Sequence, residues 1–360
     1  MIRCTRRAGW PAELGPSKST ISASTVVLII GRRLVASHPM TPRTRNHPPS
    51  RPPASAAAYL RQTPFSSPGA YEPLFEGLPA DVDGLSRVVQ GLVVHYRSRQ
   101  VLRARLPKRR LLEVNTRYVD RMLSRLMEMS PSPLTESRPV PQRIVGCCRD
   151  FATLFTAMAR HQGIPCRIRV GFASYFSHAP AGYWIDHTIA EYWKPRTRTW
   201  TLVDPEQSEA LVRENRLDFD PADVPRDQFI VGGRAWQMCR HEGADPELFC
   251  VEPKGPPRGL WFVRTRLILD LAALNREELL LWDGWGPMAP DASLSGGTLG
   301  KLDRLADALS RSTPKNVAVR GFYREPGLRH PARVYCFSPV CPPYRETLRS
   351  SIPDASSRMR

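Results

Sequence analysis

The stretch Gly146-Cys147-Cys148-Arg149-Asp150-Phe151-Ala152-Thr153-Leu154-Phe155 decides the fold of this 360-residue chain. Phe151, Leu154, Phe155 and Met158 recur at helical spacing, which predicts a buried helix that starts close to Cys148. Gly163 stands where a glycine with positive φ would stop the helix, and Pro165 lies just beyond it. The sequence therefore predicts a cysteine at the N-terminus of a buried helix.

Three runs typical of β-strands follow this helix, at residues 167–172, 188–193 and 200–203. A polar turn at residues 194–198 separates the last two runs, so they are expected to pair as an antiparallel hairpin. That pairing places residues near His187 opposite residues near Asp204. We therefore expect these two side chains to lie together, with Cys148 reaching them from the adjacent helix.

Cys148, His187 and Asp204 form a chemically coherent set. A helix N-terminus carries partial positive charge and free N–H donors, which lower the pKa of a cysteine and favour its thiolate. An imidazole beside the thiol can take its proton and later give it to a leaving group. A carboxylate on the other ring nitrogen fixes the tautomer and orientation of the imidazole.

Three sequence blocks over residues 143–206 strengthen this interpretation. They read Gly146-x-Cys148-x-Asp150-Phe151-Ala152, then Gly163-Ile164-Pro165-Cys166-Arg167 with Gly171-Phe172, then His187 with Glu191-Tyr192, Trp200 and Val203-Asp204-Pro205. In this order and spacing they resemble the transglutaminase-like superfamily, and the flanks from Tyr71 to about Trp285 resemble bacterial transglutaminase-domain proteins. The resemblance implies an α+β fold with a papain-like core, in which N-terminal helices and the catalytic helix pack on an antiparallel sheet. It carries over Cys148 as nucleophile, His187 as base and Asp204 as orienting acid.

The chain also departs from the family pattern. Thr188 follows the histidine where an aromatic residue is usual, and no equivalent of the oxyanion-stabilising tryptophan of animal transglutaminases can be assigned. Trp184 and Trp193 are candidates for a substrate groove or an oxyanion site, with core packing as the alternative. These departures leave the substrate open.

Three neighbours of the expected triad have plainer explanations. Cys147 is expected to point elsewhere as a structural thiol. Asp150 lies in the first helical turn, where an acid stabilises the helix dipole. Asp186 is a rival acid for His187, but a sequence neighbour seldom orients the same ring.

The charge of the chain is strongly positive, at +18. Residues 1–70 hold ten basic residues and one acidic residue, and residues 311–360 hold ten basic and three acidic. The body, residues 71–310, therefore carries a net charge of only +2. Only six of the 52 basic residues are lysine, which indicates a compositional bias toward arginine rather than a nucleic-acid surface.

The sequence shows no apolar run near the ~18 residues of a membrane span. The N-terminal run Val26–Ile30 is shorter than the ~7–15 residues of a signal-peptide core. We therefore expect a cytoplasmic protein whose eight cysteines are mostly free thiols.

The expected domain layout has four parts. A disordered, basic, Pro-rich extension covers 1–58, with Met40 as an alternative start. The transglutaminase-like domain with its flanks covers 59–285, and its core is 143–206. A helical extension covers 286–345, and a disordered tail covers 346–360.

These observations favour a thiol-dependent enzyme that acts on an amide or peptide bond of a protein or peptide substrate through a Cys148 thioester. Hydrolysis is slightly favoured over transfer to an amine, because bacterial members of the superfamily more often resemble peptidases or amidases. No cofactor, metal, nucleic acid or membrane is expected to take part, and the sequence leaves the oligomeric state open. The main alternative is a noncatalytic peptide- or protein-binding module that kept the fold. A third is a basic-tailed adaptor for acidic surfaces, argued from the terminal charge alone.

Overall fold

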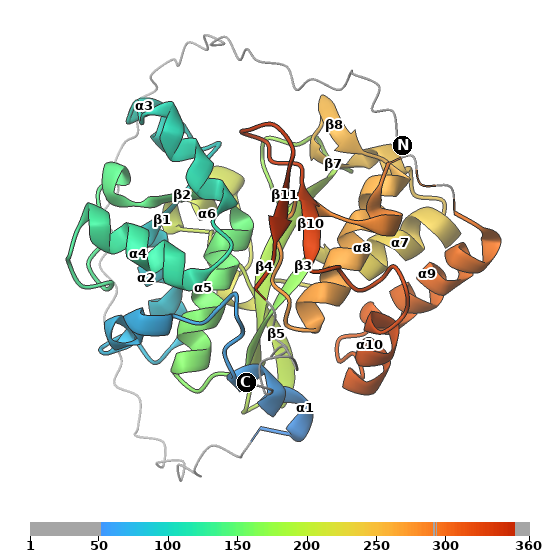
Figure 1. Ribbon diagram of the computed structural model, residues 1–360, viewed down its shortest axis with the longest axis horizontal. Helices are drawn as coiled ribbons and strands as arrows, with labels where there is room; N and C mark the ends of the chain where they lie inside the picture. Colours follow the sequence, from blue (N-terminus) through green and yellow to red (C-terminus); the bar gives the residue numbers. More distant parts are fainter. Residues whose placement is uncertain (1–51, 291, 293, 350–360) are drawn as a thin grey trace, which may run out of the picture. The chain divides into compact units, whose positions relative to one another are not determined.

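The computed structural model describes residues 52–290, 292 and 294–349 (Figure 1). Almost all of the extension expected at 1–58 lies outside these residues, as do 350–360 of the expected tail. Helix α1 (Ala54–Ala57) precedes the expected boundary at residue 58, and Ala56 is fully buried beside Tyr59, Trp193 and Trp200. Residues 54–57, which the composition assigned to the extension, therefore belong to the described body.

A six-stranded mixed sheet runs through the middle of the body (Figure 1). Its order is β6-β3-β4-β7-β8, and β5 pairs with the C-terminal half of β4. All neighbours are antiparallel except β4 and β7, so the sheet is mixed rather than purely antiparallel as expected. The strands are β3 (Cys166–Ala173), β4 (Trp184–Lys194), β5 (Thr199–Val203), β6 (Phe229–Val231), β7 (Phe249–Glu252) and β8 (Gly255–Arg258).

One group of helices lies on the left of the sheet in Figure 1. It comprises α2 (Val82–Leu92), α4 (Val119–Met129) and α5 (Cys148–His161), which pack their apolar residues into a common core. Asp81 caps α2, since its side chain accepts a hydrogen bond from the backbone N–H of Gly84 at 2.7 Å. Gly163 follows α5 with φ +74°, which confirms the stop expected from the sequence.

A second group of helices lies on the right of the sheet in Figure 1. Its members are α7 (Gly232–His241), α8 (Leu260–Leu274), α9 (Gly296–Leu309) and α10 (Asn316–Tyr323). Leu302, Leu305 and Leu309 of α9 are fully buried, as their spacing predicts. Residues 229–231 form β6 on the edge of the sheet, and α7 begins directly after it at Gly232.

Two smaller sheets complete the body. Strands β1 (Val93–His95) and β2 (Ile144–Gly146) form a parallel pair, and β2 leads directly into α5. Strands β9 (Asp283–Gly284), β10 (Arg333–Cys336) and β11 (Tyr344–Thr347) form an antiparallel sheet in the C-terminal region. The region 286–345, expected to be helical, contains α9 and α10 but also β10 and the start of β11. Residues 346 and 347, expected to belong to a disordered tail, complete β11. The remaining helices are α3 (Arg99–Arg103) and α6 (Glu209–Asn215).

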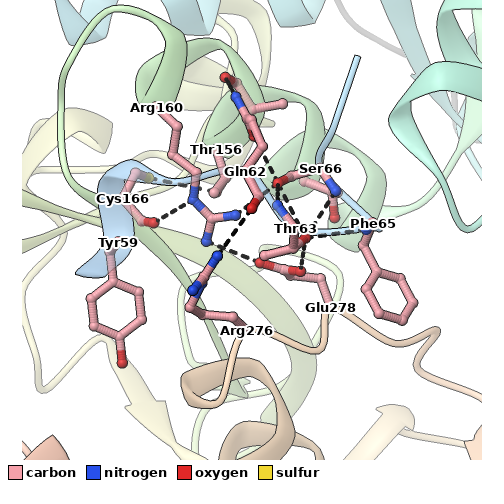
Figure 2. A network of polar contacts seen from close by, with 12 residues as sticks. Tyr59, Gln62, Thr63, Phe65, Ser66, Thr156, Arg160, Cys166, Arg276 and Glu278 are labelled. Carbon is pink, nitrogen blue, oxygen red and sulfur yellow. Dashed lines mark hydrogen bonds and ion pairs between the residues drawn. The ribbon is translucent and has the colours of Figure 1, made fainter. Parts of the chain in front are cut away.

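A buried polar network fixes the C-terminal part of α5 (Figure 2). Glu278 accepts hydrogen bonds from Thr63 Oγ1 at 2.7 Å and from Arg160 Nη2 at 2.9 Å. Arg160 also donates to Ser66 Oγ at 2.8 Å and to the carbonyl of Cys166 at 3.0 Å. The network thus ties residues 63–66, Glu278 and the first residue of β3 to α5. The network therefore fixes the C-terminal part of α5 against these segments.

A second buried network joins the sheet to α8. Glu191 of β4 is fully buried and pairs with Arg167 at 2.7 Å, with Arg169 at 3.3 Å and with Arg226 at 2.5 Å. Burial alone would raise the pKa of Glu191, but the three guanidinium charges outweigh it and lower the pKa to about 2. Arg169 also binds Asp270 of α8 at 2.8 Å. Glu191 therefore has a structural role, since its ion pairs link β4 to β3.

Candidate active site

The candidate nucleophile Cys148 is the first residue of α5. Cys147 precedes it, and its backbone N–H donates to Asp150 Oδ2 at 2.8 Å, so Asp150 satisfies one donor at the helix start. A Cβ on Gly146 would lie 2.8 Å from the same Asp150 oxygen and 3.1 Å from Val93 Cγ1. Only glycine therefore allows β2 to run into the helix at this point.

His187 and Asp204 come together as the strand register predicts. Ala190 of β4 pairs with Val203 of β5, so Asp204, which follows β5, lies near the residues that precede Ala190. His187 Nε2 is 2.8 Å from Asp204 Oδ2, and both side chains are buried. Because the carboxylate occupies Nε2, the other ring nitrogen is left for the thiol of Cys148.

Asp204 is held by more than the histidine. Tyr175 donates its hydroxyl to Asp204 Oδ2 at 2.8 Å, and Gln207 Nε2 donates to the same oxygen at 3.1 Å. The backbone N–H of Glu206 donates to Oδ1 at 3.1 Å. Burial alone would raise the pKa of Asp204, but the charge of His187 and the hydrogen bonds of His187 and Tyr175 outweigh it. The pKa is lowered, so the carboxylate stays ionised.

The pKa of Cys148 is lowered to about 6. A side-chain hydrogen bond from Cys147 is the largest cause, burial opposes it, and a hydrogen bond and the positive charge of His187 lower the pKa further. Burial also pulls the pKa of His187 down, but Asp204 and Cys148 outweigh burial and raise it well above its ordinary value. The site therefore favours a thiolate–imidazolium pair near neutral pH.

The neighbouring thiol behaves in the opposite way. The hydrogen bond to Cys148, burial and the charge of Asp150 together raise the pKa of Cys147 well above its ordinary value. Burial likewise raises the pKa of Cys166 to about 11. The two adjacent cysteines therefore differ, since the pKa is lowered at Cys148 and raised at Cys147, which shares a hydrogen bond with it.

The other sequence candidates lie in different places. Asp186 binds Arg266 of α8 through two contacts of 2.5 and 2.6 Å, so it does not orient His187. Trp184 is half-buried three residues before His187 and stacks on Phe249 with ring centroids 6.3 Å apart. Trp193 packs against Trp200 at the far end of β4, about 20 Å along the strand from His187 by the rise of an extended chain. Trp193 is therefore a core residue and not part of the site.

Several residues of the site were missed by the sequence interpretation. Tyr175 and Phe176 lie in the loop after β3, and the Phe176 ring packs edge-on against His187 with centroids 5.0 Å apart. Tyr96, which follows β1, packs against the core cluster that contains Cys147 and Cys148. The pair of aromatic residues directly after β3 could have indicated that this loop contributes to the site. No sequence pattern marks Tyr96, because only the tertiary fold brings β1 beside β2.

The fold and this geometry agree with the comparison with protein families. The family model of the transglutaminase-like superfamily matches residues 109–205. The chain therefore contains a transglutaminase-like domain. The matched range includes Cys148, His187 and Asp204 and begins upstream of the blocks that carried the resemblance. Comparisons with curated proteins and with solved structures find no match.

Three further findings concern metal ligands, thiols and membrane-spanning helices. In the described ranges, no cluster of three or more His, Cys, Asp or Glu side chains is placed to hold a metal ion. All seven cysteines within those ranges are free thiols. Among the same residues, no helix has both the length and the apolar character needed to cross a bilayer.

Proposed function

We propose that the chain is a thiol-dependent acyl-transfer enzyme with a papain-like arrangement of Cys148, His187 and Asp204. It acts on an amide or peptide bond of a protein or peptide substrate. The observation that carries this proposal is the continuous buried line of contacts from the Cys148 thiol through His187 to Asp204, in which the pKa of the thiol is lowered and that of the imidazole is raised.

In the first half-reaction, the Cys148 thiolate attacks the carbonyl carbon of the amide, and the carbonyl oxygen becomes an oxyanion. The N–H groups of Asp150 and Phe151 already donate to the carbonyl of Cys147, so we assign the backbone N–H of Cys148 at the start of α5 as a donor to that oxyanion. As the C–N bond breaks, His187 gives its proton to the departing amine. A thioester on Cys148 and a neutral imidazole remain.

In the second half-reaction, His187 takes a proton from water, and the hydroxide attacks the thioester carbonyl. The carboxylic acid leaves, and the C–S bond electrons return to Cys148 as thiolate while His187 keeps the proton. An amine in place of water gives a new amide by the same steps. Asp204 keeps the ring oriented in both halves. The triad does not choose between water and amine, and the slight preference for hydrolysis rests on the resemblance to bacterial members of the superfamily.

The test is an assay that reports both outcomes at once. The protein is incubated with casein and a fluorescent primary amine, and release of new amino termini or ammonia is followed beside incorporation of the amine. We expect release to exceed incorporation, and Cys148→Ala to abolish both. Cys147→Ala is the matched control, which should keep a measurable rate because it removes a donor to the thiolate and not the nucleophile.

Two results would contradict the proposal. Equal activity in Cys148→Ala and the native protein would exclude a thioester on Cys148. Tight binding of peptides with no turnover in the native protein would favour the noncatalytic binding module.

A further inference from the structure

A short segment beside the site carries a concentrated positive charge. Residues 97–110 contain seven basic residues and no acidic ones. Since residues 71–310 as a whole carry +2, the rest of that range carries a net charge of −5. The arginine bias of the chain is general, but this segment is the exception within an otherwise acidic body.

Most of these basic side chains face solvent. We call the exposed ones the basic patch, and they are Arg97, Arg99, Arg103, Arg105, Lys108 and Arg109. Arg97 forms an ion pair with Glu252, and both side chains are about one-third exposed. For the other five, no carboxylate among the described residues provides an ion pair. Their charge is therefore available to a partner.

The basic patch is anchored next to the nucleophile. Strand β1 runs parallel to β2, and the backbone N–H of Tyr96 donates to the carbonyl of Gly146 at 2.8 Å, two residues before Cys148. Val101 of α3 is buried in one cluster with Val94 and Val145 of these strands. The patch thus continues directly from the residues that hold the helix start.

Charges in the patch also reach the site electrostatically. After burial, Arg97 and then His187 are the causes that lower the pKa of His95, whose backbone pairs with Gly146 in the strand register. Arg97 of the patch and His187 of the site are therefore both close enough to His95 to lower its pKa.

The chemistry of the patch favours a polypeptide over a nucleic acid. Residues 97–112 contain no Phe, Tyr or Trp on which a base could stack. The exposed large apolar side chains in this range are instead Leu102 and Leu112, with 72% and 49% of their surface exposed. Cations interleaved with aliphatic side chains match a peptide that carries acidic and aliphatic residues.

From the position, charge and exposure of these residues, we propose that the basic patch binds an acidic segment of the protein substrate and presents the neighbouring amide to Cys148. The proposal rests on the proposed function and adds the class of substrate. Charge complementarity of this kind raises the rate of association and is screened by salt.

The test compares two double charge reversals. Arg99→Glu with Arg103→Glu removes the patch on α3, and Arg320→Glu with Arg324→Glu makes the same change in net charge at exposed positions at the end of α10. Binding of fluorescein-labelled hexaglutamate is measured by anisotropy at low and high salt. The rate at which iodoacetamide alkylates Cys148 is measured with and without unlabelled hexaglutamate.

We expect the native protein to bind hexaglutamate, more weakly at high salt, and the peptide to slow alkylation of Cys148. The patch variant should lose about tenfold in affinity and the α10 variant less than twofold. Equal losses in both variants would overturn the proposal, as would tighter binding of oligouridine than of hexaglutamate. Unchanged alkylation of Cys148 without peptide shows that the patch variant is folded. Absence of selective alkylation of Cys148 in the native protein would contradict the proposed function instead. The anisotropy measurement would still show whether the basic patch binds hexaglutamate.

Discussion

Replacing His187 with alanine should change how the alkylation rate of Cys148 depends on pH. With a pKa of about 6, roughly 75% of the Cys148 thiol is ionised at pH 6.5. Without the charge and hydrogen bond of His187, burial is left to offset the hydrogen bond from Cys147, and the pKa moves toward the ~8.5 of a free cysteine, at which about 1% is ionised at pH 6.5. The thiolate fraction at pH 6.5 therefore falls by almost two orders of magnitude.

The rate falls by less than the thiolate fraction, because a more basic thiolate is a better nucleophile. A Brønsted coefficient of about 0.4–0.5 over a shift of ~2.5 units raises the intrinsic reactivity roughly tenfold. The variant should thus react about sevenfold more slowly than the native protein at pH 6.5, and several-fold faster at pH 9, where both thiols are mostly ionised. The two rate–pH curves should cross between these values.

The assay is the second-order rate of iodoacetamide addition to Cys148, followed by peptide mass spectrometry from pH 5 to pH 9.5. His161→Ala is the matched control, because His161 lies at the opposite end of the same helix. Its curve should overlay that of the native protein. A His187→Ala curve with the native midpoint, or one that is lower by a constant factor at every pH, would refute the account of the low pKa.

Three further predictions concern the support of the site. Tyr175→Phe removes one donor from Asp204 and should lower the free energy of unfolding by about 1–2 kcal/mol at pH 7. Because the pKa of Asp204 is lowered in the folded state, this difference should shrink as the pH falls through that pKa, and a difference independent of pH in urea titrations would contradict it. Gly163→Ala should cost about 1 kcal/mol from positive φ alone, since nothing lies within 4 Å of an added Cβ, whereas Gly321→Ala in α10 should cost nothing. A chain starting at residue 59 should melt several degrees below one starting at residue 52, because it lacks the buried Ala56, and equal melting temperatures would show that α1 adds no stability.

Much of the site could be predicted because its information is local. The helix start at Cys148 and the hairpin that carries His187 toward Asp204 follow from periodicity and from one short turn, and the structure places them so. The order of the three motif blocks then identified Cys148, His187 and Asp204 as the candidate triad. The φ of Gly163 was predicted on the same basis, since a helix stop is a property of a few adjacent residues.

The rest depended on contacts between distant segments. Trp193 shares a strand with His187, but only the position of the N-terminal segment shows that it packs on Ala56 and Tyr59. Tyr175 reaches Asp204 through a loop whose path has no periodic signal. The sheet of β10 and β11 was not predicted, because each strand is stabilised by pairing with the other and the composition of a segment does not reveal its pairing partner.

The most direct test of the central claim is the order in which the cysteines of the native protein react. The full chain is treated at pH 6.5 with a limiting amount of iodoacetamide, and each labelled peptide is quantified by mass spectrometry over time. Since the pKa of Cys148 is about 6 whereas the pKa values of Cys147 and Cys166 are raised, the account predicts that Cys148 is alkylated first and far ahead of both. Faster labelling of Cys147 or Cys166 than of Cys148 would contradict the assignment of the nucleophile.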